Sequence, residues 1–405
     1  MKRKQVKMGL FGYGVVGQGL YEAIHQTPTL NAEISKICIK HADKKRNLPI
    51  SFFTTEADEL IYNSEINTIV ELIDDSEAAF QIVKKSLIAG KSVVSANKKM
   101  IAEHFDELLE LQTQTGSSLL YEAACCASIP IIRNLEEYYD NDLLEHVEGI
   151  VNGSTNYILS QIDSYQISPE IALKKAQELG FAESNPIMDT GGFDAKFKLI
   201  LLIGHAFGVV VKPEDVFHLG IDRLGDLELQ YAKEKQFKIK LIAVATRLKS
   251  GEIGAWVLPK FVEDSDPIYA VNDVFNGIKT KSFFSDYQFF VGKGAGAYPT
   301  ASAVISDISA LSYDYKYEYK KLRNIAQNAS GITEDIQFKV LFRFPSKTEI
   351  SVDSYFQNTQ ERLTRESSSY IIGNIRLERL KSLISVFGES CSVVLFNRIE
   401  ADVQN

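Results

Sequence analysis

The chain has 405 residues, of which 45% are hydrophobic and 24% charged, as in ordinary globular proteins, and this length suggests two or three domains. The formal net charge of −9 argues against nucleic acids and anionic membrane surfaces as partners. No apolar run is long enough to cross a bilayer, so we expect no membrane association. The four cysteines, Cys38, Cys125, Cys126 and Cys391, show neither disulfide nor zinc spacing, which favours a reducing, cytoplasmic location.

The first third of the chain alternates strands with helices. Its apolar pattern predicts strands over 6–11, 34–39, 68–73, 92–95 and 118–122, and helices over 16–26 and 78–89. Because strand and helix alternate at this interval, we expect a parallel, doubly wound sheet. This pattern predicts a first domain over residues 1–133. We expect a later segment, at about 292–330, to complete this domain.

The pattern changes after Pro130. We predict helices over 131–139, from 156, over 169–180 and over 195–207, and strands over 144–151, 239–247, 256–259, 276–280 and 287–291. These elements indicate a second, α+β domain over 134–291 with an open sheet. A turn with Gly292, Gly294 and Gly296 then leads into a helix over 300–312. A third section, 335–405, shows three strands, over 338–344, 368–372 and 392–396, with helices between them.

A glycine-rich turn directly follows the first predicted strand and opens the first helix. The residues Gly12, Tyr13, Gly14, Val15, Val16 and Gly17 give the pattern Gly-x-Gly-x-x-Gly. In a βαβ unit this pattern indicates a dinucleotide site, in which glycines admit the pyrophosphate close to the helix N-terminus. A glycine turn that binds no ligand is the alternative. The first domain is therefore expected to be of the Rossmann type.

The end of the second strand bears on the choice of cofactor. An NAD-binding domain usually has an acidic residue there, whereas this chain has Lys40, followed by Lys44, Lys45 and Arg46. A basic group at this place can pair with a 2′-phosphate. We therefore favour NADP over NAD, and the alternative is that residues 44–46 form a solvated loop.

An acidic segment holds Glu183, Asp189, Asp194 and Lys198 within sixteen positions. Three carboxylates close to one amine could bind an amino-acid ammonium group and move a proton. Lys198 follows Asp194 by four residues, so both side chains lie on one helix face. In isolation, a helix cap and an exposed ion pair explain the same residues.

Several stretches together resemble homoserine dehydrogenases. These are Gly12–Gly17, Ser95-Ala96-Asn97-Lys98, Tyr121–Ala124 with Ile129–Ile132, Gly149–Tyr157, Glu183–Lys198 and Gly292–Ala303. The resemblance spans roughly residues 5 to 310 and implies reversible, NAD(P)H-dependent reduction of L-aspartate 4-semialdehyde to L-homoserine, on the route to threonine, methionine and isoleucine. The chain departs from the family where Asp74-Asp75 replaces a glycine pair and where Cys125-Cys126 replaces a glycine-rich turn. Cys125 and Cys126 could also suggest a nucleophile, although packing is the simpler role.

The resemblance implies roles for individual residues. Lys198 corresponds to the proton donor and Asp194 to its orienting partner, while Lys196 is expected at the surface. Lys98 is a second candidate acid or a nicotinamide contact. For the substrate the resemblance indicates Glu183, Asp189, Asn152, Gly153 and Thr155; for the cofactor Ser95, Gly294 and Gly296 beside the first glycine turn and Lys40; and for a sodium ion Glu122, Cys125, Ala127 and Ile129.

The resemblance also bears on assembly and regulation. It implies a homodimer through the open sheet of the second domain. It implies a C-terminal ACT-like domain that binds threonine as an allosteric ligand, with a structural or dimerisation tail as the alternative. Two other functions stay open at this point: a dehydrogenase of a related amino-acid aldehyde, and a non-catalytic nucleotide-binding sensor.

Overall fold

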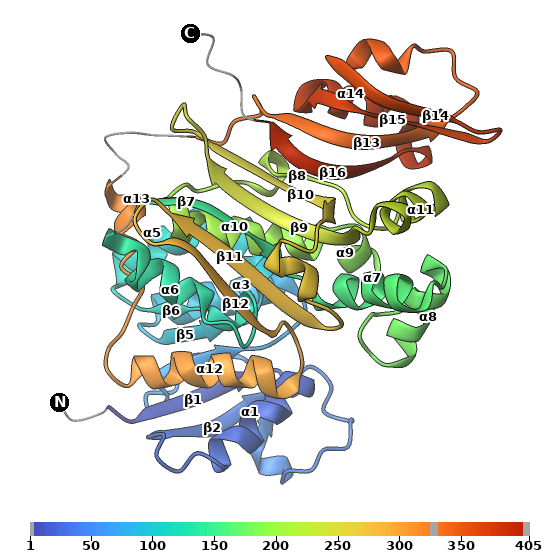
Figure 1. Cartoon of the computed structure of the whole chain (residues 1–405). Helices are drawn as coiled ribbons and strands as arrows, with labels where there is room; N and C mark the ends of the chain where they lie inside the picture. The colour runs from blue at the N-terminus through green and yellow to red at the C-terminus, as the bar shows by residue number, and fades with distance from the viewer. Residues whose placement is uncertain (1–3, 142, 325–330, 400–405) are drawn as a thin grey trace. The chain divides into compact units, whose positions relative to one another are not determined.

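The computed structural model describes residues 4–141, 143–324 and 331–399, and the chain divides into two compact units (Figure 1). The first unit comprises Met1–Asp142, Ile200–Pro213 and Gly292–Gln327, and the second comprises Leu143–Leu199, Glu214–Val291 and Asn328–Asn405. Within the described ranges, no helix is both long and apolar enough to cross a membrane.

The first unit is built on a six-stranded parallel sheet with the order β3-β2-β1-β4-β5-β6. Its strands are β1 (Val6–Phe11), β2 (Ala32–Cys38), β3 (Phe53–Thr54), β4 (Thr68–Glu71), β5 (Ser92–Ser95) and β6 (Leu119–Leu120). The strand order reverses between β1 and β4, and ligands bind at such a switch point, at the carboxyl ends of the strands. The predicted Rossmann-type sheet is confirmed.

Helices of the first unit cover this sheet. They are α1 (Val15–His25), α2 (Asp58–Ile61), α3 (Ser76–Ile88), α4 (Lys98–Glu103), α5 (Phe105–Thr115), α6 (Ile131–Glu137), α12 (Ala297–Leu311) and α13 (Lys320–Asn324), with a 3₁₀ turn η2 (Glu122–Ala124). Although α12 is distant in sequence, it packs along α1 (Figure 1). Gly19 makes this close approach feasible, since a Cβ there would lie 3.1 Å from the carbonyl oxygen of Ala297.

The second unit is built on a ten-stranded mixed sheet. Its main path is β12-β11-β7-β9-β10-β16-β13-β15-β14, and β8 pairs with β10. The strands before the C-terminal section are β7 (Leu144–Ile150), β8 (Phe217–His218), β9 (Lys238–Arg247), β10 (Ile253–Val262), β11 (Phe275–Ser282) and β12 (Asp286–Lys293). The helices are α7 (Gly153–Tyr165), α8 (Pro169–Glu178), α9 (Ile187–Thr190), α10 (Phe193–Phe207), whose residues from Ile200 onward belong to the first unit, and α11 (Asp226–Lys235).

The C-terminal section adds four strands to this sheet, where the sequence predicted three. They are β13 (Gln337–Pro345), β14 (Asn358–Thr364), β15 (Ser368–Arg376) and β16 (Ser392–Ile399). The prediction of helices between all strands is wrong, since one helix, α14 (Leu377–Phe387), is accompanied by the short 3₁₀ turns η7 (Val352–Tyr355) and η8 (Gly388–Ser390). The order β16-β13-β15-β14 is that of a ferredoxin-like domain whose first helix is reduced to η7 (Figure 1).

Candidate active site

The glycine turn after β1 has the geometry that a dinucleotide requires. Gly12 has φ +94, and a Cβ there would lie 2.5 Å from the carbonyl oxygen of Leu72, so only glycine fits. Gly17 packs against Gly12, since its Cβ would lie 2.4 Å from the Gly12 carbonyl oxygen. No atom lies within 4 Å of a Cβ at Gly14, at the N-terminal end of α1. The turn thus leaves room for a pyrophosphate beside the helix.

The neighbouring residues of the turn have different surroundings. Val15 is exposed and Val16 half-buried, whereas the Tyr13 hydroxyl donates to Asn47 Oδ1 at 3.0 Å. The second glycine turn lies before α12, where Gly296 has φ +119 at the helix N-cap and Gly294 is buried. Both glycine turns belong to the first unit. The departure at Asp74-Asp75 has a local explanation, because the Asp75 side chain caps α3 by accepting from the Ala78 amide at 3.0 Å.

A buried carboxyl group joins the carboxyl ends of β4 and β5. Glu71 is fully buried; its carboxylate accepts from Ser95 Oγ at 2.5 Å and from the Ile73 amide at 2.7 Å. Ser95 Oγ in turn accepts from the amide of Asn97 at 3.1 Å. Asn97 caps the helix α4 that begins at Lys98. This chain of contacts fixes the start of α4, and with it the backbone of Lys98, at the edge of the sheet where ligands bind.

Glu71 makes the stability of the first unit depend on pH. Burial raises the pKa of its carboxyl from 4.5 to about 7, and the bonds from Ser95 and Ile73 only partly offset this. The folded chain then holds a proton that the unfolded chain releases, so its contribution is complete below pH 4.5 and is lost as the pH rises through 7. Between pH 4.5 and 7 the free energy of unfolding of the unchanged protein should fall by a value on the order of 3 kcal/mol. This fall should be absent in Glu71→Gln, and urea unfolding across the pH range measures the difference. Parallel profiles of the two proteins would contradict the assignment.

A pocket of about 580 Å³ lies at the end of β2. Its lining is of mixed charge, with the basic residues Lys44, Lys45 and Arg46 and the acidic residues Asp43, Glu56 and Glu59. Arg46 shapes this loop, since its guanidinium donates to the carbonyl oxygens of Lys44 at 2.7 Å and His41 at 2.6 Å. The loop is therefore ordered by its own bonds and presents its charge to a cavity. Lys40, the residue that the sequence favoured, is exposed and does not belong to this lining.

The second unit brings Asn152, Asp189, Asp194 and Lys198 together. Lys198 Nζ lies 2.8 Å from Asp194 Oδ2 and donates to the carbonyl oxygen of Val151 at 2.8 Å. Asn152 Nδ2 donates to Asp189 Oδ1 at 2.7 Å and to Asp194 Oδ2 at 2.8 Å. The Asp194–Lys198 pair is buried, with side chains 7% and 9% exposed, so the exposed surface pair considered from sequence is excluded. A buried amine held by two acceptors is suited to moving a proton to a ligand.

Asn152 has two functions in this cluster. Its Oδ1 caps α7 by accepting from the Thr155 amide at 2.8 Å, and its Nδ2 holds the two carboxylates. Thr155 Oγ1 donates to Asn152 Oδ1 at 2.9 Å, and this orients the amide. Gly153 is required for packing, since a Cβ there would lie 2.8 Å from the carbonyl oxygen of Val274. Asn152 therefore caps α7 and contacts the carboxylates of Asp189 and Asp194 at the same time.

The pKa of Asp189 rises in this environment. Burial is the main cause and the neighbouring carboxylate of Asp194 adds to it, while the bond from Asn152 acts in the opposite direction. Two carboxylates bridged by one amide and faced by one ammonium form a site with excess negative charge. Such a site attracts a second cation, and the ammonium group of an amino-acid substrate is a cation of suitable size.

Two residues of the acidic segment differ from expectation. Glu183 is exposed on the segment between α8 and α9, and its backbone carbonyl accepts from Gln177 Nε2 at 2.9 Å. The contacts described for this segment do not bring the Glu183 carboxylate into the buried cluster. Lys196 was expected at the surface, and that is wrong: it is 8% exposed, with Nζ 5.2 Å from the ring centroid of Phe193. Because α10 is apolar on most of its surface, even its polar residues are enclosed.

The segment 122–129 forms a buried loop in the first unit. Glu122 caps α6, because its carboxylate accepts from the amides of Ile132 and Arg133, each at 2.9 Å. Ala127 has φ 44, so the loop adopts a left-handed turn at this residue without a glycine. Cys125 and Cys126 are buried free thiols with sulfur atoms 3.8 Å apart. Their burial fits the packing role that the sequence suggested.

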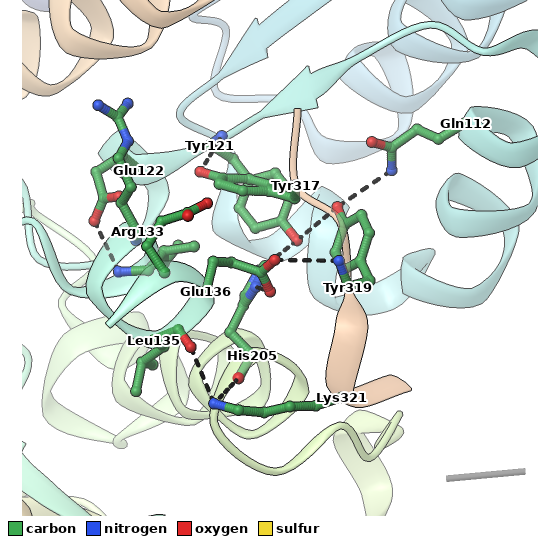
Figure 2. Close-up of polar contacts among 12 residues, drawn as sticks. Gln112, Tyr121, Glu122, Arg133, Leu135, Glu136, His205, Tyr317, Tyr319 and Lys321 are labelled. Atoms are coloured by element: carbon green, nitrogen blue, oxygen red, sulfur yellow. Dashed lines mark hydrogen bonds and ion pairs between the residues drawn. The ribbon is translucent and has the colours of Figure 1, made fainter. Parts of the chain in front are cut away.

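The sequence did not predict a polar network that lies within the first unit (Figure 2). His205 Nε2 lies 2.7 Å from the Tyr121 hydroxyl, and His205 Nδ1 lies 2.6 Å from Glu136 Oε1. Tyr319 donates its amide to Glu136 Oε2 at 3.1 Å, and its hydroxyl lies 3.2 Å from that of Tyr121. These residues come from four separate segments and are buried. The network therefore fixes those segments to one another rather than offering a site to a ligand.

Comparisons with known proteins agree with this geometry. The family model "Homoserine dehydrogenase" matches residues 130–309, and the model "Homoserine dehydrogenase, NAD binding domain" matches residues 12–122. A homoserine dehydrogenase of Bacillus subtilis is 35% identical over 317 residues, which cover 76% of this chain and 73% of the relative. One of Synechocystis is 36% identical over 313 residues, which cover 75% and 72%.

Solved structures extend the likeness to the C-terminal section. The crystal structure of a homoserine dehydrogenase from Thiobacillus denitrificans has a TM-score of 0.82 at 26% identity and covers 97% of this chain and 98% of that one. The S. aureus homoserine dehydrogenase at pH 8.5 has a TM-score of 0.73 at 26% identity and covers 98% and 99%.

The dinucleotide turn agrees with the matched NAD-binding model, and the matches together show an NAD(P)-dependent oxidoreductase that acts on a CH–OH group. The length and the sequence identity of the matches show which family of oxidoreductases this is. The chain belongs to the homoserine dehydrogenase family. This excludes the sensor and the dehydrogenase of another aldehyde as the favoured functions.

Proposed function

We propose that Lys198 is the proton donor in the reduction of L-aspartate 4-semialdehyde to L-homoserine, and the acceptor in the reverse direction. The buried ion pair with Asp194 carries this proposal, since it fixes Nζ and keeps the amine charged until a proton is moved. Bound nicotinamide would supply or take up the hydride. Lys98, at the start of α4, is proposed as a second candidate acid or a nicotinamide contact.

The substrate would be held through its two charged ends. Asp189 and Asp194, bridged by Asn152, would bind the ammonium group, and Glu183 would add to this negative region from the exposed segment. The N-terminus of α7, at Gly153, would face the carboxylate, because helix N-termini favour anions, and Thr155 would act through the Asn152 side chain that it orients. A spectrophotometric assay of homoserine oxidation, with NADP and NAD in parallel, tests this function. Absence of oxidation with both would contradict it.

NADP is the proposed cofactor, and the basic residues Lys44, Lys45 and Arg46 in the lining of the pocket after β2 support this preference. The residues of the glycine turns, 12–17, 294 and 296, with Ser95 and Lys98, would hold the pyrophosphate and the nicotinamide side. A relative of similar fold was solved as a hyperthermophilic archaeal enzyme in complex with NADPH, with a TM-score of 0.66 at 25% identity. NAD would be used less well, because it lacks the 2′-phosphate that the pocket would bind.

The cofactor preference can be tested at Lys44 and Lys45. We expect Lys44→Ala with Lys45→Ala to raise the dissociation constant of NADP by about tenfold and to leave that of NAD unchanged, as loss of one or two charge-assisted contacts implies. Fluorescence titration measures both constants. Lys40→Ala is the matched comparison, because Lys40 is basic and exposed but lies outside the pocket lining. A larger loss from Lys40→Ala would move the 2′-phosphate site to Lys40.

The loop Glu122–Ile129 is proposed to bind a sodium ion through carbonyl oxygens of Glu122, Cys125, Ala127 and Ile129. The tight, buried turn at Ala127 fits a carbonyl site better than a carboxylate site. Among the described residues, no group of three or more His, Cys, Asp or Glu side chains could hold a metal. Thermal unfolding in sodium chloride against choline chloride at equal ionic strength tests the proposal, and equal midpoints would contradict it.

A homodimer is proposed, with contacts through the sheet of the second unit. Large apolar side chains support it: Phe283 and Phe284, at the turn between β11 and β12, are 66% and 74% exposed. We expect Phe283→Ser with Phe284→Ser to shift the chain toward the monomer, measured by sedimentation at micromolar concentration. Tyr62→Ser, an exposed aromatic residue of the first unit, is the control. An unchanged dimer in the double variant would place the interface elsewhere.

We also propose a cellular location and a regulator for the chain. Four free cysteines support a reducing cytoplasm, where the chain would act in the synthesis of threonine, methionine and isoleucine. The ferredoxin-like C-terminal strands support a regulatory, ACT-like domain that binds threonine. A titration of the reaction rate with threonine tests this, and no change at millimolar threonine would favour the structural alternative.

A further inference from the structure

The C-terminal domain is connected to the acidic segment by an arginine. Arg343 on β13 donates from Nε to Glu228 Oε1 of α11 at 2.8 Å, and Glu228 is fully buried. The same guanidinium donates from Nη2 to the carbonyl oxygen of Arg223 at 2.7 Å and from Nη1 to that of Ser390 at 3.1 Å. Such a planar group with three fixed acceptors holds each of them in a defined position.

The segment that Arg343 holds, residues 219–225, is hydrogen-bonded directly to the acidic segment. The amides of Ile221 and Asp222 both donate to the carbonyl oxygen of Thr190, at 2.7 and 3.3 Å. Gly220 packs against the same peptide, since a Cβ there would lie 1.8 Å from the Thr190 oxygen. Thr190 directly follows Asp189, whose carboxylate Asn152 binds.

The other end of the 219–225 segment is fixed as well. Leu219 donates its amide to the carbonyl oxygen of Val257 at 2.9 Å, which anchors it to β10. The Gly225 amide donates to Glu228 Oε2 at 3.3 Å, and Arg223 Nη1 donates to the carbonyl oxygen of Gly388 in the C-terminal domain at 3.0 Å. The segment therefore has few ways to shift unless the contacts of Arg343 change.

We propose that Arg343 is a positioning residue through which the C-terminal domain holds the carboxylates of residues 187–194 in place to bind substrate. This inference rests on the proposed role of Asp189 and Asp194. It assigns the C-terminal domain a function in substrate binding even without an effector. A ligand that changed the β13–α11 contact would then change homoserine affinity without touching the cofactor.

The first test replaces the buried pair as a whole. Arg343→Met with Glu228→Leu removes both charges, because loss of the arginine alone would leave a buried carboxylate and could unfold the domain. We expect the KM for homoserine to rise about tenfold, with a smaller change in kcat and an unchanged dissociation constant for NADP. Arg362→Met, which removes an ion pair with Asp353 at the domain surface, is the control and should change neither constant.

The second test acts on the other end of the connection and keeps the proposal falsifiable if the double variant does not fold. Gly220→Ala should displace the Thr190 peptide and raise the same KM, whereas Gly331→Ala, which has no atom within 4 Å of its Cβ, should not. An unchanged KM in a folded variant, or an equal rise for NADP, would overturn the proposal.

Amide hydrogen exchange gives a readout that does not depend on activity. Residues 187–194 should exchange faster in Arg343→Met with Glu228→Leu and in Gly220→Ala than in the unchanged protein. If the unchanged protein does not oxidise homoserine, the proposed function fails, but faster exchange would still support the structural connection. Unchanged exchange would reject the connection whatever the activity.

Discussion

Replacing Lys198 by alanine is expected to lower kcat for homoserine oxidation by about 10³-fold, while the dissociation constant of NADP stays the same. General acid–base catalysis by a positioned group raises the rate on the order of 10²–10⁴-fold. A water molecule in the alanine variant would not be positioned as Nζ is positioned by Asp194 and the carbonyl oxygen of Val151. The variant leaves Asp194 buried without its cation, so folding is checked by circular dichroism. Steady-state kinetics and a fluorescence titration with NADP measure the two effects.

Lys196→Met is the matched control for this prediction. Lys196 lies on the same helix and is equally buried, and its Nζ lies over the rings of Phe193 and Phe197. Methionine keeps the apolar stem that covers these rings. We expect kcat to stay within about threefold of the unchanged protein, since surface of the same shape is retained. Near-normal turnover in Lys198→Ala would show that another group, with Lys98 as the first candidate, donates the proton.

The sequence predicted the relations that follow from local geometry. The spacing of Asp194 and Lys198 placed both on one helix face, and the position of Gly12–Gly17 after a strand indicated the nucleotide turn; both have the expected geometry. Their burial was not predictable in the same way, because it depends on elements far away in the chain. Lys196 shows the difference. The helical period placed it on another face of α10, but this period does not show that the rest of the protein also buries that face.

Two of the missed elements are largely polar. Strand β14 has the sequence Asn-Thr-Gln-Glu-Arg-Leu-Thr and is mostly exposed, so it carries no apolar alternation, and only pairing with β15 makes it a strand. Helix α11 was also missed, although acidic residues in its first turn and lysines in its last turn could have indicated it. The contact of Arg343 with Glu228 spans 115 positions, and nothing local to either residue indicates it.

The buried network of His205 is the clearest case of a feature beyond sequence reasoning. Tyr121, Glu136, His205 and Tyr319 come from separate segments of the chain (Figure 2), and only Tyr121 stands in a stretch that carries the family resemblance. Each has a polar group that would be costly to bury alone. Together they satisfy one another, so their common burial can only be seen once the tertiary structure is known.

Replacing Glu136 by leucine is expected to lower the free energy of unfolding of the first unit by about 3–5 kcal/mol, the usual cost of leaving a buried charged or hydrogen-bonded partner alone. The substitution removes the acceptor of His205 Nδ1 and of the Tyr319 amide, both of which are buried. This is a large part of the stability of a typical domain. Urea unfolding measures the change, and Glu137→Leu, the exposed neighbour that accepts from the Tyr315 hydroxyl at 2.8 Å, is the control with an expected loss below about 1 kcal/mol.

The pH dependence of this network distinguishes charge from packing. Burial acts to raise the pKa of Glu136, but the hydrogen bond and charge of His205, with the Tyr319 amide and Lys321, lower it on balance. A lowered folded-state pKa means that the stabilisation is present above the ordinary value of 4.5 and is lost as the pH falls through the folded value. Glu136→Gln keeps an acceptor for His205 but cannot titrate, so its acid limb should be flatter than that of the unchanged protein. If Glu136→Leu unfolds with a free energy within 1 kcal/mol of the unchanged protein, the network contributes packing alone, and His205 and Tyr319 must find other partners.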